Sequence, residues 1–187
     1  ADTGDRITVR HLLTHTSGLM VDFYAHFPDG KKYSHADLLS QLRGEYLCFK
    51  PGSACKYSNI GYRLLGMIIE KVTGERFEAY LEKEIFRPLG LDRSTFSYTD
   101  DMTHMSKGHD GNKETSRVDN EDKSASGLFS TLKDLTVFLR FLSSGATLSR
   151  GGIRNSQIID SIMKNNQAID TFYDSKNIYS SVWYVNS

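Results

Sequence analysis

The sequence predicts a mainly α-helical chain in which strands are confined to the C-terminal part. Apolar residues recur at one-turn spacing in several segments, most regularly over residues 59–73, which is typical of amphipathic helices. Residues 173–185 are instead aromatic and β-branched, a composition that favours one or two strands. So few strand candidates are unusual for a self-contained enzyme whose active site is supported by a sheet.

The N-terminal half is expected to contain two short helices. Thr8 is suited to cap a helix over residues 9–15, and Ser34 to cap a second helix over residues 36–43. The segment at residues 16–18, Thr-Ser-Gly, ends the first of them. The side chains expected to point inward are Leu12, Leu13, Leu38, Leu39 and Leu42.

The most regular helix covers residues 59–73 and ends at Gly74, because glycine adopts the left-handed conformation that stops a helix. A further helix is expected over residues 77–86. Pro88 is expected to forbid its continuation, since proline has no backbone N–H to donate. The buried faces of these two helices are expected to comprise Ile60, Leu64, Leu65, Ile68, Ile69, Val72, Phe77, Leu81 and Ile85.

Residues 99–124 are rich in charge and poor in large apolar groups, so we expect a long surface loop there. The segment from Thr131 to Asp134 resembles a capping box in which Asp replaces Glu, and it opens a helix that Gly145 ends. A last helix is expected over residues 156–164. The helix after Thr131 is expected to bury Leu135, Phe138, Leu139 and Leu142.

The composition excludes two classes of function. The 187 residues suit one domain, or one domain with a small annex. Lysine plus arginine and aspartate plus glutamate number 23 each, so the formal net charge is zero. This balance lacks the basic excess of a nucleic-acid binder, so no nucleic-acid partner is expected. The sequence has no run of about 18 apolar residues, so no membrane-spanning segment is expected.

The two cysteines, Cys48 and Cys55, are not in a C-x-x-C pair, which argues against a zinc knuckle or a thioredoxin-type site. They flank the turn signal Lys50-Pro51-Gly52, which favours their approach. The sequence leaves two alternatives open, a disulfide or two buried free thiols.

Two patterns have the spacing of metal ligands but not their full chemistry. His11 and His15 are four residues apart, yet Leu12 stands where zinc proteases have a glutamate. Residues 110–121 match a calcium loop loosely, with Thr115 at the position that requires glycine. We therefore expect neither a metal nor a cofactor. The structural alternative is that one histidine caps a turn and the other packs against it.

The S-x-x-K pattern occurs three times. In Ser/Lys hydrolases this spacing places a hydroxyl and an amine one helical turn apart, so that the amine activates the hydroxyl. Here the first pair falls in a turn, the second precedes the better cap Thr131, and the third lies at the polar edge of a predicted helix. None is expected to supply a nucleophile. The pairs are Ser53–Lys56, Ser130–Lys133 and Ser161–Lys164.

The segment Tyr57-Ser58-Asn59 runs directly into the most regular helix. Residues 57 and 59 project similarly from an extended segment, and a helix N-terminus adds positive potential there. A phenol and an amide at that point suit proton transfer and hydrogen bonding. The structural alternative makes Asn59 the N-cap and Tyr57 a packing residue.

The segment ITVRHLLTHTSGL at residues 7–19 resembles a hallmark segment of the class C β-lactamase-like serine hydrolases. This family includes class C β-lactamases, D-alanyl-D-alanine carboxypeptidases and related esterases. Further stretches that resemble the family follow in the expected order, and together the matches run over residues 7–142. These stretches are PG and YSNIGY within residues 51–62, LGMIIEKVTG at residues 65–74, PLGL at residues 88–91 and SGLFST at residues 126–131.

The resemblance implies an α+β parent fold of the β-lactamase/transpeptidase type. The chain, residues 1–187, would then be a partial serine hydrolase domain, mostly its helical subdomain. The family uses an upstream S-x-x-K nucleophile, a Y-x-N motif and a K-T-G or H-x-G strand near the C-terminus. Only the Y-x-N motif is recognised here, so the nucleophile segment and the C-terminal sheet segment are expected to be absent from this chain.

By resemblance, Tyr57 would be the general base or proton relay, and Asn59 would hydrogen-bond the substrate amide or the catalytic lysine. The reaction would be acyl transfer through an acyl-enzyme, on a β-lactam, a D-alanyl peptide or an ester. An ordinary tyrosine has a pKa of about 10, so the family needs neighbouring cations to ionise it. The isolated chain is therefore expected to be inactive.

Two competing hypotheses remain at this stage. The chain could belong to a catalytically dead homologue that binds ligands or regulates, or to an unrelated helical interaction module. An S-x-x-K about one helix before Ala1 would favour the enzyme over the dead homologue. The expected partner is a small-molecule or peptide substrate. The family's habit and the cysteine pair suggest a location outside the cytoplasm, periplasmic or secreted.

Overall fold

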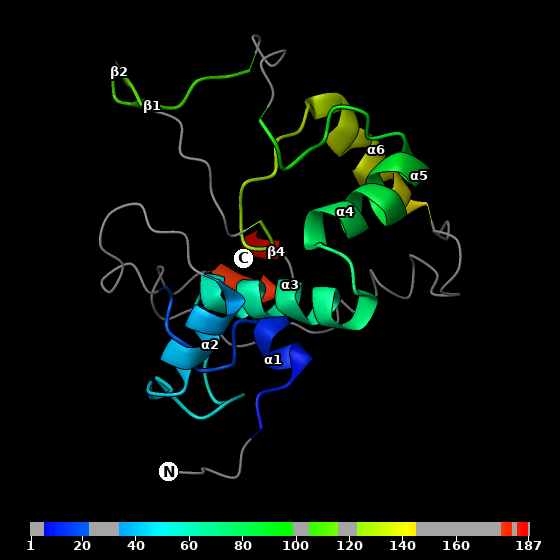
Figure 1. Cartoon of the computed structure of the whole chain (residues 1–187). Coiled ribbons are helices and arrows are strands. Elements are labelled where there is room, and N and C mark those ends of the chain that lie inside the picture. The colour runs from blue at the N-terminus through cyan, green and yellow to red at the C-terminus, as the bar shows by residue number, and fades with distance from the viewer. Residues whose placement is uncertain are drawn as a thin grey trace.

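The computed structural model describes residues 6–22, 34–98, 105–115, 123–144, 177–180 and 183–186, the last two ranges as backbone only. Figure 1 shows how these segments are arranged. The elements, in chain order, are α1 (Val9–Leu13), α2 (His35–Leu42), α3 (Asn59–Thr73), α4 (Phe77–Leu81), the π-helical turn η2 (Glu82–Phe86), α5 (Arg87–Leu89), β1 (His109–Asp110), β2 (Lys113–Glu114), α6 (Leu132–Ser143), β3 (Asn177–Ser180) and β4 (Trp183–Asn186). The described part is thus mostly helical, as expected.

Helix α3 is the central element of the described chain. Its bounds agree with the prediction, and Gly74 ends it with a φ of 73°. Helices α1 and α2 lie on one side of α3, and α4, α5 and α6 lie toward the other (Figure 1). Two separate apolar clusters follow from this arrangement, one on each side.

The first cluster joins the N-terminal segments to α3. Its fully buried members come from α1, the segment after it, α2 and α3, and they are Leu12, Leu19, Leu38 and Ile60. The prediction that Leu39 is buried is wrong, because its side chain is 45% exposed. Helix α2 contacts the cluster through Leu38 and Leu42 alone, and Leu39 lies about 100° further around the helix.

The second cluster is formed by Phe86, Leu91 and Phe96. The ring of Phe96 is stacked with Phe86 at a centroid distance of 6.0 Å and meets the edge of Phe77 at 5.7 Å. An antiparallel bridge between Thr95 and Phe129 ties this cluster to the segment that leads into α6. The cluster therefore assembles from three parts of the chain rather than from one helix pair.

The expectation that Pro88 forbids helical continuation is wrong. The helix widens to a π turn over η2 and then continues through α5, where Pro88 lies in the first turn, before Gly90 ends it with a φ of 66°. Proline is tolerated in the first turn of a helix because its missing N–H would have no intrahelical partner there.

Asp134 does not complete the capping box predicted at the start of α6. Thr131 caps the helix as expected, accepting from the backbone N–H of Asp134 at 3.2 Å. The carboxylate of Asp134 is buried and turns elsewhere, accepting from the backbone N–H of Arg93 and from the hydroxyl of Ser94, both at 2.9 Å. It thereby holds residues 93–94 against α6.

The apolar face of α6 is less buried than predicted. Leu135 and Leu139 are 46% and 49% exposed, and Phe138 is half-buried. These side chains line an apolar pocket of about 480 Å³ together with Leu81 and Ile85. Phe138 packs against the second cluster, whereas Leu135 and Leu139 remain largely exposed beside this space, so burial falls short of the pattern in the sequence.

The charged segment at residues 99–124 contains a hairpin that the sequence analysis did not predict. Strands β1 and β2 pair antiparallel, with His109 opposite Glu114. Residues 111–112 form the two-residue loop between the paired Asp110 and Lys113, and Gly111, with a φ of 59°, supplies the positive φ that its first position needs. The hairpin extends away from the helices (Figure 1).

The predicted strands near the C-terminus are confirmed. Strands β3 and β4 pair antiparallel, with Asn177 opposite Asn186 and Ser180 opposite Trp183. The helix expected over residues 156–164 lies outside the described residues. Within the described ranges, no helix has both the length and the apolar character that crossing a bilayer would require.

Both cysteines are free, which excludes a disulfide between them in this structure. Cys55 is buried and its thiol approaches the carbonyl oxygen of Thr14 at 3.6 Å. Cys48 is exposed, and its sulfur accepts from the Lys56 amine at 3.4 Å. The two thiols therefore contact different groups, Cys55 the backbone of Thr14 and Cys48 the side chain of Lys56.

Replacing Asp134 with alanine should destabilise the fold. Asp134→Ala leaves the backbone N–H of Arg93 and the hydroxyl of Ser94 without their acceptor, which should lower the free energy of unfolding by about 1–3 kcal/mol. Urea unfolding followed by circular dichroism measures this loss. Asp92→Ala, which removes an exposed carboxylate nearby, should change it by less than about 0.5 kcal/mol. Equal effects of the two substitutions would contradict the assigned role of Asp134.

Candidate functional site

Tyr57 and Asn59 lie where an irregular segment enters the N-terminus of α3. The intervening residue, Ser58, is the N-cap of the helix. Its hydroxyl accepts from the backbone N–H of Gly61 at 3.1 Å and donates to the carbonyl oxygen of Met20 at 2.7 Å. The alternative that made Asn59 the cap is therefore wrong, because Asn59 is the first residue of the helix itself.

A buried polar segment after α1 forms the wall against which this corner is built. Thr14, His15, Thr16 and Ser17 are each at most 2% exposed, so their polar groups need partners within the protein. The hydroxyl of Thr14 donates to the carbonyl oxygen of Arg10 at 2.8 Å, and the hydroxyls of Thr14 and Thr16 lie 2.9 Å apart. A polar segment is stable in the core only when it is bonded in this way.

Residues 48–56 run alongside this polar segment and bond to its backbone. The amides of Cys48, Gly52 and Lys56 donate to the carbonyl oxygens of Gly18, Thr16 and His15 at 2.7, 2.8 and 2.9 Å. Gly18 has a φ of 79°, and a β-carbon there would collide with the carbonyl oxygen of Phe49. Only glycine suits this close crossing, and the crossing fixes the path of the chain toward Tyr57.

His15 is the residue of the wall that lies closest to the corner. Among the described non-glycine residues it alone has a left-handed backbone, with a φ of 56°. Its Nδ1 accepts from the backbone N–H of Ser58 at 3.1 Å, which assigns the ring proton of the neutral imidazole to Nε2. Burial lowers the pKa of His15 to about 4, so the ring is neutral at pH 7.

Two tyrosine rings pack against the His15 ring. Tyr57 lies at a centroid distance of 4.7 Å and Tyr62 at 5.0 Å. The Tyr62 hydroxyl donates to the carbonyl oxygen of Leu13 at 3.1 Å, which fixes that ring on α1. Tyr57 is only half-buried, so it is not sealed in the apolar core.

The side chain of Asn59 is oriented by Asp22. Its Nδ2 donates to Oδ2 of Asp22 at 3.1 Å, and its backbone N–H donates to the carbonyl oxygen of Val21 at 2.9 Å. A carboxylate only accepts, so this bond assigns the amide nitrogen to the Asp22 side. Oδ1 of Asn59 is then the group that accepts a hydrogen bond from an incoming N–H.

Two opposing electrostatic contributions meet at the corner, the partial positive potential of the α3 N-terminus and the negative charge of the Asp22 carboxylate bonded to Asn59. Helix α3 is 15 residues long and its N-terminus, with the positive end of the helix dipole, lies beside Tyr57 and Asn59. The buried histidine next to Tyr57 adds no charge at pH 7, because its pKa is about 4. The corner alone supplies an acceptor amide, a phenol and a partial positive potential.

The S-x-x-K pairs do not form Ser/Lys dyads in the described chain. The Ser53 hydroxyl donates to the carbonyl oxygen of Lys50 at 2.7 Å, while Lys56 donates to Cys48. The Ser130 hydroxyl lies 2.8 Å from that of Ser94, within the hydrogen-bond network of Asp134. The third pair, Ser161–Lys164, lies outside the described residues.

The two histidines of the metal-like pattern have separate structural roles. Nδ1 of His11 accepts from the backbone N–H of Thr8 at 3.3 Å, and Thr8 accepts from the His11 amide in return. His11 thus completes a capping box, and His15 packs between two rings. Across the part of the chain that the structure describes, no three His, Cys, Asp or Glu side chains gather as metal ligands would.

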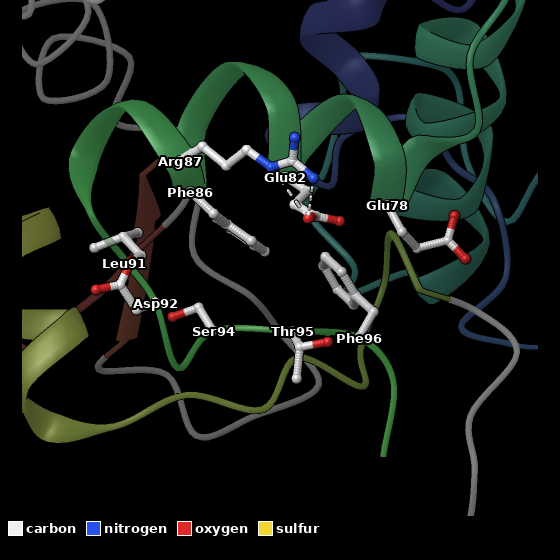
Figure 2. Close-up of a pocket in the computed structure, with 9 residues that line it drawn as sticks. All are labelled: Glu78, Glu82, Phe86, Arg87, Leu91, Asp92, Ser94, Thr95 and Phe96. Carbon is white, nitrogen blue, oxygen red and sulfur yellow. Dashed lines mark hydrogen bonds and ion pairs between the residues drawn. The ribbon is translucent and has the colours of Figure 1, made fainter. Parts of the chain in front are cut away.

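A polar pocket of about 350 Å³ lies beside α4 and η2, on the opposite side of α3 from α1 and α2 (Figures 1 and 2). Glu82 is paired with Arg87 at 2.7 Å, and the rings of Phe86 and Phe96 face each other across the pocket. Tyr57 and Asn59 line neither this pocket nor the apolar one. The Ser94 hydroxyl at this pocket is engaged by the Asp134 carboxylate and lies beside the Ser130 hydroxyl. Its lining residues are Glu78, Glu82, Phe86, Arg87, Leu91, Asp92, Ser94, Thr95 and Phe96.

Sequence reasoning missed three contributors to the corner. Ser58 could have been found, because serine is as good an N-cap as asparagine and stands one position earlier. The contact of Asp22 with Asn59 spans 37 residues and the contact of His15 with Ser58 spans 43, so neither has a local signal.

The family model described as Beta-lactamase matches residues 1–174 of the chain. The N-acetylmuramyl-L-alanine amidase of Bacillus subtilis (strain 168) is 31% identical over 186 residues, which cover 83% of this chain and 41% of that protein. Penicillin-binding protein 4* of the same organism is 39% identical over 93 residues, covering 47% of this chain and 21% of that protein.

A solved structure, the Beta-Lactamase/D-Alanine Carboxypeptidase from Pseudomonas syringae, superposes with a TM-score of 0.72 at 20% sequence identity. The match covers 95% of this chain and 48% of that one, so the two proteins share a fold. The chain therefore spans less than half the length of each of these three proteins.

The buried His15 should make stability fall in acid. The folded state holds the ring neutral down to about pH 4, whereas the unfolded chain takes up a proton near pH 6.5. Stability from this group is therefore full above pH 6.5 and should be lost, by about 3 kcal/mol, as the pH falls to 4. Urea unfolding of the wild type and of His15→Asn at pH 7 and pH 4.5 isolates the contribution. An identical pH dependence in both would contradict it.

Proposed function

The chain belongs to the Beta-lactamase family, and we propose on that basis that it is the helical part of a serine hydrolase that works by acyl transfer. The proposal assigns Tyr57 as general base or proton relay and Asn59 as a hydrogen-bonding group of the same reaction centre. The nucleophilic serine and its lysine would come from an S-x-x-K motif outside residues 1–187. The observation that carries this assignment is the fixed corner formed by the half-buried Tyr57, the oriented Asn59 and the N-terminus of α3.

Tyr57 suits a proton carrier because it combines access with rigid support. Its ring packs against His15, and the residue remains partly exposed. In the proposed acylation the phenolate would take the proton of the attacking serine hydroxyl as the serine oxygen bonds to the substrate carbonyl. Tyr57 would then return this proton to the leaving nitrogen or oxygen as the carbonyl–leaving-group bond breaks.

Ionisation of Tyr57 would need more positive charge than the helix dipole supplies. A phenol with a pKa of about 10 is ionised in about one molecule in a thousand at pH 7. An adjacent ammonium group favours the phenolate. The lysine of the proposed nucleophile motif and a cation from the third motif would provide that charge, which is why the corner alone is not expected to react.

Asn59 suits a hydrogen-bond acceptor in the same centre. Asp22 engages its amide nitrogen, so Oδ1 is directed to partners that donate. A substrate amide N–H and a lysine ammonium group are both donors of that kind. Either partner would be held within reach of Tyr57, because the two residues flank Ser58, whose position is fixed by three hydrogen bonds.

The proposed substrates are β-lactams, D-alanyl peptides or esters, all of which present a carbonyl to a serine. The relatives are named for N-acetylmuramyl-L-alanine amide cleavage, penicillin binding and β-lactam or D-alanine chemistry, and they support an amide-type carbonyl most directly. The same names suggest a cell-wall setting, so we place the protein outside the cytoplasm, periplasmic or secreted.

The isolated chain should not be acylated. Residues 1–187, purified alone, are expected to show no covalent labelling by a fluorescent penicillin or a fluorophosphonate, because Ser53 and Ser130 are engaged in structural hydrogen bonds. The complete protein, labelled in parallel on a gel, is the positive control. Labelling of the isolated chain, with the site located by mass spectrometry, would show that the nucleophile lies within it.

Removing the hydroxyl of Tyr57 should abolish most of the activity of the complete protein. Tyr57→Phe is expected to lower kcat by about 10² or more, as loss of a general base does. Tyr46→Phe removes a hydroxyl from a side chain that is 88% exposed and should leave kcat unchanged. Steady-state kinetics on a chromogenic β-lactam or ester measures both. A fully active Tyr57→Phe enzyme would refute the role of Tyr57, whereas a complete wild-type protein without turnover would favour the ligand-binding homologue.

A further inference from the structure

Beyond the residues of the proposed reaction centre, the structure singles out a buried histidine that the chemistry does not use. His15 has a left-handed backbone with a φ of 56°, which costs an L-residue other than glycine conformational energy. Such strain persists only where surrounding contacts fix it, and it is concentrated at functional sites. Three of the contacts of His15 lead to the segment that carries Tyr57.

Two hydrogen bonds from His15 bracket Tyr57 along the chain. The backbone carbonyl oxygen of His15 accepts from the amide of Lys56 at 2.9 Å, and Nδ1 of its ring accepts from the amide of Ser58 at 3.1 Å. The residues on either side of Tyr57 are therefore bonded to one residue.

The ring of His15 also supports the ring of Tyr57 directly. Their centroids are 4.7 Å apart, and Tyr62 packs on His15 from a further side at 5.0 Å. Tyr62 is itself held by the carbonyl oxygen of Leu13. The Tyr57 ring thus packs against a histidine that itself packs against the anchored Tyr62, which limits the range of positions of the Tyr57 hydroxyl.

We infer that His15 is a positioning residue, which fixes the backbone and the ring of Tyr57 so that its hydroxyl meets the reacting atoms. The inference rests on the proposed function of Tyr57. A displacement of a catalytic group by about 1 Å can cost about a hundredfold in rate. His15 itself exchanges no proton with substrate, because its Nδ1 is bonded to Ser58 and its ring is buried.

Two substitutions separate the contributions of the ring and of the hydrogen bond. His15→Phe keeps a ring against Tyr57 but removes the acceptor for the Ser58 amide. His15→Asn removes the ring but keeps an acceptor close to the position of Nδ1, and asparagine tolerates a left-handed backbone. We expect His15→Phe to lower kcat of the complete protein by about tenfold to a hundredfold with little change in KM. His15→Asn should recover part of that loss by restoring the bond to Ser58.

The decisive experiment is a double-mutant cycle with Tyr57→Phe in the complete protein. If His15 acts through Tyr57, then His15→Phe should change kcat by no more than about twofold in the Tyr57→Phe background. Asp134→Ala is the matched control, because it should destabilise a remote part of the fold and leave kcat unchanged at temperatures where the protein stays folded. Additive losses, unchanged kcat in His15→Phe, or equal losses in His15→Phe and His15→Asn would each overturn the inference.

The cycle also separates this inference from the proposed function. A Tyr57→Phe protein with full activity refutes the proposed role of Tyr57 and, with it, the positioning role. A large loss in Tyr57→Phe combined with full activity in His15→Phe refutes only the positioning role.

If His15→Phe fails to fold, a measurement on the wild-type protein still tests the inference. The ¹⁵N chemical shifts of the His15 ring in the wild type should show a bare Nδ1 and a protonated Nε2 at pH 7. A protonated Nδ1 would exclude the bond from Ser58 and overturn the inference.

Discussion

The left-handed turn at His15 is the constraint on which the arrangement of this chain depends. The turn follows the C-terminus of α1, and the chain then runs alongside residues 48–56. These residues lead into α3 through Tyr57 and Ser58. The buried ring satisfies the amide of Ser58, and the hydroxyl of Ser58 caps α3. One residue therefore links the end of the first helix to the beginning of the central one. Burial keeps the imidazole neutral, and its Nδ1 accepts from the amide of Ser58.

Because the segment behind the corner is polar and not apolar, its position relative to residues 48–59 is sharply defined. Apolar side chains tolerate small sliding movements, whereas hydrogen bonds have narrow limits of distance and angle. Thr14, His15, Thr16 and Ser58 are all buried and all bonded to partners far along the chain or one turn away. These hydrogen bonds thus fix the register between residues 14–22 and the segment that carries Tyr57 and Asn59. An apolar interface of the same size would define that register less sharply.

The sequence predicts features that depend on residues close together in the chain, and it does not predict contacts between residues that are far apart. The bounds of α3 follow from a repeating apolar pattern, and the caps Thr8, Ser34 and Thr131 follow from side chains that bond three residues ahead. Asp134 does not complete the predicted capping box because its carboxylate accepts instead from two donors about 40 residues earlier, the amide of Arg93 and the hydroxyl of Ser94. Pro88 is accommodated by a π turn that no local rule anticipates.

The same division holds for the candidate site. Tyr57 and Asn59 are recognised through the Y-x-N pattern and its resemblance to a family, but their support comes from His15 and Asp22, which are distant in sequence. Burial on α6 was overestimated because a periodic face shows which side is apolar, not whether another element covers it.

The central claim is that Tyr57 and Asn59 belong to the reaction centre of a serine hydrolase. The most direct measurement is a crystal structure of the complete protein acylated by a β-lactam. The account predicts that the Tyr57 hydroxyl lies about 2.6–3.2 Å from the oxygen of the acylated serine, with Oδ1 of Asn59 accepting a hydrogen bond from the adduct or from a lysine beside it. An adduct on a serine beyond the reach of Tyr57, such as Ser53 or Ser130, would contradict it.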